Sequence, residues 1–126
     1  MEFVKTDRAP AAVGPYSQAV KVGNWLFVSG QIALNPETGK LEGETAAEQT
    51  ERILKNLKAI LEAAGFDLKE VVKVTIYTTD LEEFPKINEV YARFFGDHRP
   101  ARATVGVCNL PLGAKVELEA VAFKGP

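Results

Sequence analysis

The chain of 126 residues has the size of one ordinary domain and can bury one core without disulfides. Its 15 basic and 17 acidic side chains leave a net charge of −2, which argues against a general attraction to nucleic acid or to a membrane surface. One cysteine excludes an internal disulfide, and one histidine makes a zinc site within a single chain improbable. We therefore expect a single domain over residues 1–126 and no metal site.

The first 14 residues contain neither an apolar run nor a cleavage-site pattern, so they do not resemble a signal peptide. No apolar stretch approaches the roughly 18 residues that indicate a membrane span. Together with the single cysteine, these features predict a reducing compartment, most simply the cytoplasm.

The first predicted elements are two β-strands within residues 17–34. They flank Gly23-Asn24, a pair that suits a two-residue hairpin turn because both residues tolerate positive φ. The sequence NPETGK at residues 35–40 predicts a second turn.

A helix is expected from Thr45, where apolar residues begin to recur every three or four positions. Thr45 and Glu48 have the spacing of a capping box, and Gly65 is suited to end the helix in a left-handed conformation. The predicted buried face consists of Ile53, Leu54, Leu57, Ile60, Leu61 and Ala64.

A strand follows at residues 70–79, with Val72, Val74 and Ile76 predicted to face the core. Residues 80–96 predict a second helix, capped by Asp80 and with Pro85 near its first turn. Its expected buried face is formed by Phe84, Ile87, Tyr91 and Phe94.

Two further strands, at residues 99–110 and 115–120, complete the order ββαβαββ. This order predicts an α+β fold in which two helices pack on one face of a mostly antiparallel sheet of four to six strands.

Charged side chains inside these last two strands are the first candidates for function. If Ala103 and Val105 face the core, strict alternation places Arg102 on the helix-free face. The same alternation places Glu117 there, between the core residues Val116 and Leu118. Three interpretations remain open: a cross-strand ion pair at a subunit interface, a substrate site, and plain solvent exposure. In the substrate site, Arg102 would bind a carboxylate and Glu117 would handle protons.

A second group of candidates lies near the start of the chain. Tyr16 follows Gly14-Pro15 and is either a half-buried aromatic residue or a hydroxyl directed into a pocket. Ser29 and Gly30 interrupt a predicted strand, which indicates either a β-bulge or a place where a ligand approaches the backbone.

Several stretches in succession resemble the signatures of one known family. They are GPYSQAV, FVSGQI, NLKAILEAAG, VVKVTIYTTDLEEFPKINEVYARFF and PARATVGVCNLPLGAKVELEA. Their order and spacing are similar to those of the RidA family, also called the YjgF family, over nearly the whole chain. The pairing of PAR with VELEA at this interval is a specific feature of that family.

The resemblance implies a chorismate-mutase-like fold and a homotrimer whose sheets form an inner barrel, with ligand clefts between subunits. It implies hydrolysis of reactive enamines and imines, such as 2-aminoacrylate and 2-aminocrotonate, to 2-keto acids and ammonia without a cofactor. The expected partners are therefore other copies of the chain and a small imino or keto acid. No membrane partner is expected, and the net charge of −2 argues against nucleic acid.

The resemblance also suggests catalytic roles. Arg102 is similar to the arginine that binds the substrate carboxylate, and Glu117 to the acid that positions or activates water. Tyr16 is similar to the tyrosine that lines the cleft from a neighbouring subunit. Burial would raise the pKa of Glu117 and a nearby arginine would lower it, and the sequence leaves open which effect is larger.

The expected substrate-binding residues are Ser29, Gly30, Asn88 and Thr104. Thr104 stands where many relatives have cysteine, but the backbone carbonyl expected to hold the substrate nitrogen is retained. Cys108 is interpreted as a small apolar filler. Two other functions remain as alternatives: a non-catalytic trimeric binder of 2-keto acids or related metabolites, and an endoribonuclease or translation inhibitor.

Overall fold

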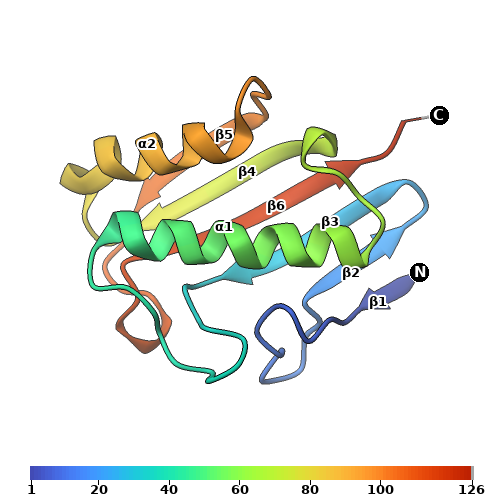
Figure 1. Ribbon diagram of the computed structural model, residues 1–126, viewed down its shortest axis with the longest axis horizontal. Coiled ribbons are helices and arrows are strands. Elements are labelled where there is room, and N and C mark those ends of the chain that lie inside the picture. The colour runs from blue at the N-terminus through green and yellow to red at the C-terminus, as the bar shows by residue number, and fades with distance from the viewer. Residues whose placement is uncertain (126) are drawn as a thin grey trace.

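The computed structural model describes residues 1–125 and shows one six-stranded sheet with two helices on one of its faces (Figure 1). The predicted α+β architecture is therefore confirmed, with one additional strand at the N-terminus. The strands are β1 (Glu2–Val4), β2 (Ala19–Val22), β3 (Trp25–Gln31), β4 (Val71–Thr78), β5 (Ala101–Gly106) and β6 (Val116–Phe123). The helices are α1 (Ala46–Ala63) and α2 (Phe84–Phe95).

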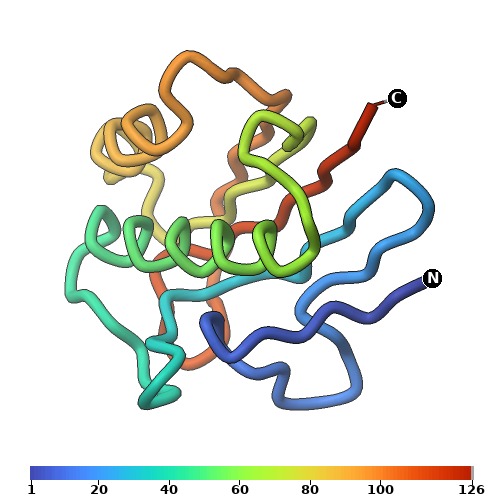
Figure 2. The backbone as a smooth tube through the Cα atoms, turned by 45° about the vertical axis from the view of Figure 1, so that its right-hand side comes forward, coloured from blue at the N-terminus to red at the C-terminus, as the bar shows by residue number. Residues whose placement is uncertain are grey.

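The strand order β1-β2-β3-β6-β4-β5 explains why both helices lie on the same face. Among the strands of residues 1–125, the only parallel pair is β4 with β5. Strands β3 and β4 also run in the same direction, because each is antiparallel to β6. The connection from β3 through α1 to β4 and the connection from β4 through α2 to β5 both lead toward the β5 edge of the sheet. Since such crossovers are almost always right-handed, both helices reach the same side of the sheet (Figure 2).

Helix α1 begins and ends with the signals predicted from the sequence. The Thr45 side chain accepts a hydrogen bond from the backbone of Glu48, whose carboxylate in turn accepts one from the Thr45 backbone. Gly65 has φ 81°, and the Phe66 N–H donates to the Leu61 carbonyl at 2.8 Å. This is the hydrogen-bonding pattern of a Schellman C-cap.

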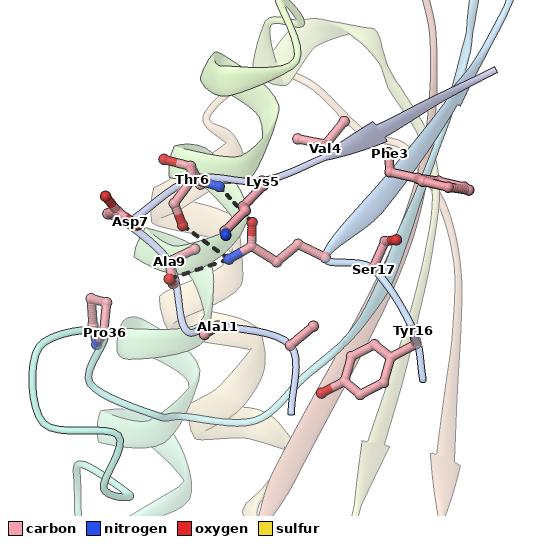
Figure 3. A pocket seen from close by; sticks show the side chains of 12 residues that line it. Phe3, Val4, Lys5, Thr6, Asp7, Ala9, Ala11, Tyr16, Ser17 and Pro36 are labelled. Carbon is pink, nitrogen blue, oxygen red and sulfur yellow. Dashed lines mark hydrogen bonds between the residues drawn. The ribbon is translucent and has the colours of Figure 1, made fainter. Parts of the chain in front are cut away.

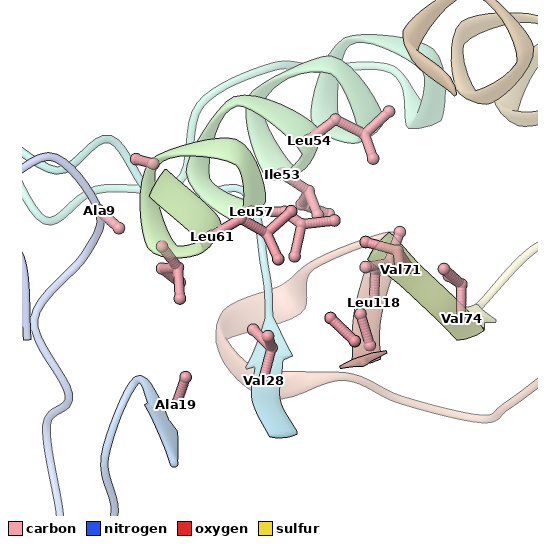
Figure 4. Close-up of a cluster of buried hydrophobic side chains, with 14 of the residues drawn as sticks. Ala9, Ala19, Val28, Ile53, Leu54, Leu57, Leu61, Val71, Val74 and Leu118 are labelled. Carbon is pink, nitrogen blue, oxygen red and sulfur yellow. The ribbon is translucent and has the colours of Figure 1, made fainter. Parts of the chain in front are cut away.

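The core lies between α1 and the middle strands of the sheet (Figure 4). Leu57 and Leu61 of α1 are almost fully buried, as are Val74 and Leu118 on the helix-covered face of β4 and β6. This packing fixes which residues of each strand face the helices.

The predicted burial of Val72 is wrong, because the pairing of β4 with β6 shifts register between Val71 and Lys73. Val71 is fully buried, whereas Val72 is 40% exposed. A β-bulge of this kind adds one residue and reverses the alternation on one side of it.

Helix α2 is preceded by a short 3-10 turn, Leu81–Glu83, which the Asp80 side chain caps by accepting from the Glu82 N–H at 3.0 Å. Pro85 lies in the first turn of α2, as predicted. Phe84 and Phe94 are only half-buried, and the buried residues of this helix are Ile87, Val90, Tyr91 and Phe95. Within residues 1–125, neither helix combines the length and apolar character needed to cross a membrane.

Candidate functional site

A hollow of about 680 Å³ opens on the sheet side that carries Glu117. It brings together four of the predicted site residues, which come from the N-terminal loop, β3 and β6. They are Tyr16, Ser29, Gly30 and Glu117.

Glu117 is positioned by the alternation of β6. Its neighbours Val116 and Leu118 are fully buried under the helices, so Glu117 projects from the helix-free face. Burial raises the pKa of the Glu117 carboxyl above its ordinary value, and the nearby Glu119 carboxylate raises it further. Within residues 1–125, burial is the larger of the two causes that raise the pKa of Glu117, and no arginine is among them.

Gly30 provides the space that the Glu117 carboxyl occupies. A Cβ at Gly30 would collide with Oε2 of Glu117 and would lie 3.1 Å from its Cδ. The pairing of β3 with β6 shifts register between Val28 and Gln31, so the predicted bulge is present at this position. The irregular backbone and the missing side chain together let the carboxyl approach the strand closely.

Tyr16 and Ser29 are held at the wall of the hollow by the neighbouring loop. The Tyr16 N–H donates to the Gly14 carbonyl at 2.9 Å, and Gly14 has φ 134°. The Ser29 hydroxyl donates to the Ser17 carbonyl at 2.5 Å. Tyr16 is 54% exposed in the single chain, so about half of this residue is accessible at the wall of the hollow.

A second hollow of about 670 Å³ shares Tyr16 but not Glu117 (Figure 3). In Figure 3, Tyr16 lies at one end of this pocket and Val4 at the other. The buried Gln18 side chain ties its loop together, accepting from the Thr6 N–H at 2.8 Å and donating to the Pro10 carbonyl at 2.7 Å. These bonds satisfy Gln18 within the fold, so we assign this side chain a structural role.

Arg102 lies against α2 rather than in the Glu117 hollow. Its Nη1 donates to Oδ1 of Asn88 at 2.8 Å. The guanidinium carbon is 4.7 Å from the ring centre of Tyr91 and 5.2 Å from that of Phe84. These three residues, spaced i, i+4 and i+7 on α2, form what we call the arginine cradle: Phe84, Asn88 and Tyr91.

The prediction that Arg102 and Glu117 share one face of the sheet is wrong. Arg102 pairs with Val74, which is fully buried under the helices, whereas Glu117 pairs with Tyr77 on the opposite face. Strand β4 also separates β5 from β6. A cross-strand ion pair between Arg102 and Glu117 within one chain is therefore excluded.

The remaining predicted residues divide between the two faces. Thr104 pairs with the buried Ile76 and so shares the face of Arg102. Cys108 lies beyond the end of β5 and is exposed, so its interpretation as an apolar filler is wrong. The sequence analysis missed Phe84 and Tyr91 as neighbours of Arg102, although their spacing around Asn88 on one helix face was a usable signal.

The one histidine of the sequence, His98, makes a contact within the fold. The ring Nε2 of His98 is 2.7 Å from the Val71 carbonyl, an interaction that ties the segment after α2 to the start of β4. Within residues 1–125, no three His, Cys, Asp or Glu side chains gather into a potential metal-binding group.

The sequence profile of the Endoribonuclease L-PSP family matches residues 6–124, which is nearly the whole chain. The chain belongs to this family, the RidA family. Among RidA relatives, a mouse 2-iminobutanoate/2-iminopropanoate deaminase is 46% identical over 99% of this chain and 93% of its own length. The chloroplastic Reactive Intermediate Deaminase A of Arabidopsis thaliana is 51% identical over 96% of this chain and 65% of its own length.

Solved structures of RidA relatives have the same fold. A Thermotoga maritima protein solved as a candidate endoribonuclease is 60% identical and superposes with a TM-score of 0.97, covering 100% of this chain and 99% of the other. RidA from an Antarctic Psychrobacter is 47% identical with a TM-score of 0.95, covering 98% of this chain and 100% of the other. Escherichia coli TdcF, solved with bound serine, is 41% identical with a TM-score of 0.94, covering 99% and 100%.

Proposed function

We propose that this protein hydrolyses 2-imino acids and their enamine tautomers to 2-keto acids and ammonia. The observation that carries the proposal is the Glu117 carboxyl, which is held half-buried against Gly30 at the wall of an open hollow. A carboxyl with a raised pKa holds a proton more readily than an exposed one and is a stronger base once ionised. The deaminase names of the mouse and Arabidopsis relatives support the same chemistry.

The reaction requires little covalent chemistry from the protein. Water adds to the electrophilic carbon of the protonated imine while Glu117 accepts a proton from that water, which gives a carbinolamine. Glu117 then returns the proton to the carbinolamine nitrogen, and ammonia leaves as the hydroxyl proton passes to solvent and the carbonyl forms. Arg102 binds the substrate carboxylate and so positions the imine carbon. No cofactor takes part in this scheme.

This scheme requires more than one copy of the chain. Neighbouring strands lie about 4.8 Å apart, so residues on β5 and β6, with β4 between them, are about 10 Å apart before their side chains diverge. Arg102 and Glu117 also point to opposite faces of the sheet. We propose a homotrimer in which Arg102, Asn88 and Thr104 of one subunit meet Tyr16, Ser29, Gly30 and Glu117 of the next.

A coupled assay tests this function. A threonine dehydratase generates 2-aminocrotonate, semicarbazide traps the free imine, and the formation of 2-ketobutyrate is followed for wild type, Arg102→Ala and Glu117→Gln. Acceleration by wild type alone supports the deaminase and both roles. No acceleration by a verified trimer rejects the proposed activity.

A second candidate is a binder without catalysis, favoured by the relative that was solved with bound serine. A binder needs Arg102 to hold a carboxylate but has no need of proton transfer by Glu117. Under this alternative, Glu117→Gln retains 2-ketobutyrate affinity and wild type shows no turnover. The endoribonuclease alternative is supported by the description of the family and by that of the Thermotoga maritima relative. The net charge of −2 and the contact of the single histidine with the Val71 carbonyl argue against it.

A further inference from the structure

We infer that Phe84 and Tyr91 are positioning residues, whose rings hold the Arg102 guanidinium in the orientation that receives the substrate carboxylate. The inference rests on the proposed function and extends it to two residues that contact Arg102 rather than the reacting atoms. It assigns the arginine cradle on α2 a role in selecting anionic imines.

Arg102 needs such support because of its place in the fold. It lies on β5, which has only one neighbouring strand within the described chain. An arginine side chain is long and flexible, and it loses much rotational freedom when it binds a ligand in one geometry. Contacts that fix the guanidinium beforehand reduce that loss.

The two rings provide these contacts in different ways. Tyr91 is 6% exposed and packs on Phe95 with ring centres 4.7 Å apart, so its position is set by the core. Phe84 is half-buried at the start of α2. Because both lie within cation–π distance of Arg102, the guanidinium is attracted to surfaces that are already fixed.

The nature of these partners leaves the guanidinium available to an anion. Among the side-chain hydrogen bonds of residues 1–125, the Arg102 guanidinium donates only to the neutral amide oxygen of Asn88. Neither of the two ion pairs of that range, Arg8 with Glu62 and Arg52 with Glu42, involves it. An aspartate or glutamate in the cradle would compete with the substrate carboxylate, whereas a ring attracts the cation without occupying its in-plane N–H donors.

The Tyr91 hydroxyl does not explain the presence of this residue. It is buried, and none of the residues 1–125 gives it a hydrogen-bond partner. The ring is therefore the part of Tyr91 that contacts Arg102, and phenylalanine should replace it.

The test compares Tyr91→Phe, Tyr91→Leu and Phe84→Leu in the assembled protein, with Phe94→Leu as a control on the same helix. Phe94 is half-buried like Phe84, and it packs edge-on against Phe95. The probe is 2-ketobutyrate, whose affinity is measured by calorimetry, and kcat and KM are measured in the coupled assay.

We expect Tyr91→Leu and Phe84→Leu to weaken 2-ketobutyrate binding and raise KM about five- to twenty-fold, with kcat within about two-fold of wild type. Tyr91→Phe and Phe94→Leu should bind like wild type. Wild-type affinity in Tyr91→Leu would overturn the inference, as would an equal loss in Tyr91→Phe, which would assign the effect to the hydroxyl. An equal loss in Phe94→Leu would show general damage to α2 and would also overturn it.

A spectroscopic readout separates this inference from the proposed activity. The Arg102 Nε–H resonance should be shifted by the ring currents of the cradle in wild type and should move toward its free position in Tyr91→Leu. This holds even if wild type hydrolyses no imine, in which case the deaminase proposal fails alone. An Arg102 resonance that is identical in both proteins would overturn the inference whatever the activity.

Discussion

The Glu117 carboxyl occupies the space that any side chain at Gly30 would fill. Gly30 does not have a positive φ, so alanine can adopt its backbone conformation without strain. The conflict is therefore with the end of a flexible glutamate side chain, which can move aside. A methyl group at this position should change the location of the carboxyl far more than the stability of the fold.

We accordingly expect Gly30→Ala to fold and assemble normally while kcat/KM for imine hydrolysis falls at least about ten-fold, because a displaced base loses its alignment with water. The control is Gly125→Ala, where an added Cβ meets nothing within 4 Å. Steady-state kinetics with thermal melts measure both effects. Full activity in Gly30→Ala would show that the carboxyl does not act from its observed position.

The raised pKa of Glu117 predicts how stability depends on pH. The folded chain binds this proton more tightly than the unfolded chain, so the stabilisation is complete below the ordinary glutamate value of 4.5. It is lost as the pH rises through the higher folded pKa. Glu117→Gln should therefore raise Tm more at pH 7 than at pH 4, and under the proposed mechanism it should also abolish turnover.

Melts at a single protein concentration test this pH dependence, since assembly makes Tm depend on concentration. Glu89→Gln, an exposed site on α2, is the control and should show no such difference between the two pH values. An equal or larger gain for Glu117→Gln at pH 4 would contradict the assigned direction of the pKa shift.

Features that depend only on residues close together in the sequence were predicted correctly. The cap formed by Thr45 and Glu48 and the left-handed Gly65 follow from local hydrogen bonding, and both are present. The bulge at Val72 was not predictable in this way. It arises from the pairing of β4 with β6, a strand that lies more than 40 residues further along the chain.

The face of Arg102 was mispredicted for a related reason. The alternation of β5 was interpreted on the assumption that its valines face the core under the helices. Val105 is instead 41% exposed and lies on the helix-free face. At the β5 edge, α2 presents rings and an amide that accommodate an arginine. The sequence thus identified Arg102 and Glu117 as candidates, but their separation depends on tertiary packing.

Two lysines from the sheet side should stabilise the C-terminus of α1, which has no basic residue in its last turn. The Lys124 ammonium donates to the Gly65 carbonyl at 2.5 Å, and Lys21 donates to the Ala64 carbonyl at 3.5 Å. We expect Lys124→Met to lower the free energy of unfolding by about 0.5–1 kcal/mol in urea titrations. Lys58→Met, an exposed site on α1, is the control, and an equal loss there would reject a specific capping role.

The most strained backbone at the candidate site belongs to Leu112, on the rim of the Glu117 hollow. Leu112 is the only non-glycine residue within 1–125 with positive φ, at 57°, and its side chain is 72% exposed. Asparagine tolerates this conformation better, so Leu112→Asn should increase the unfolding free energy by about 0.5–1 kcal/mol.

Strain of this kind is often retained near functional sites, and we therefore expect KM for 2-iminobutanoate to rise in the same variant.

The matched control for Leu112→Asn is Val13→Asn. Val13 is 85% exposed and lines the same hollow, but its φ is not positive. It therefore has no left-handed strain to relieve, and its substitution should leave the urea midpoint unchanged. A stability gain of the same size in both variants would attribute the effect to reduced surface hydrophobicity rather than to the backbone of Leu112.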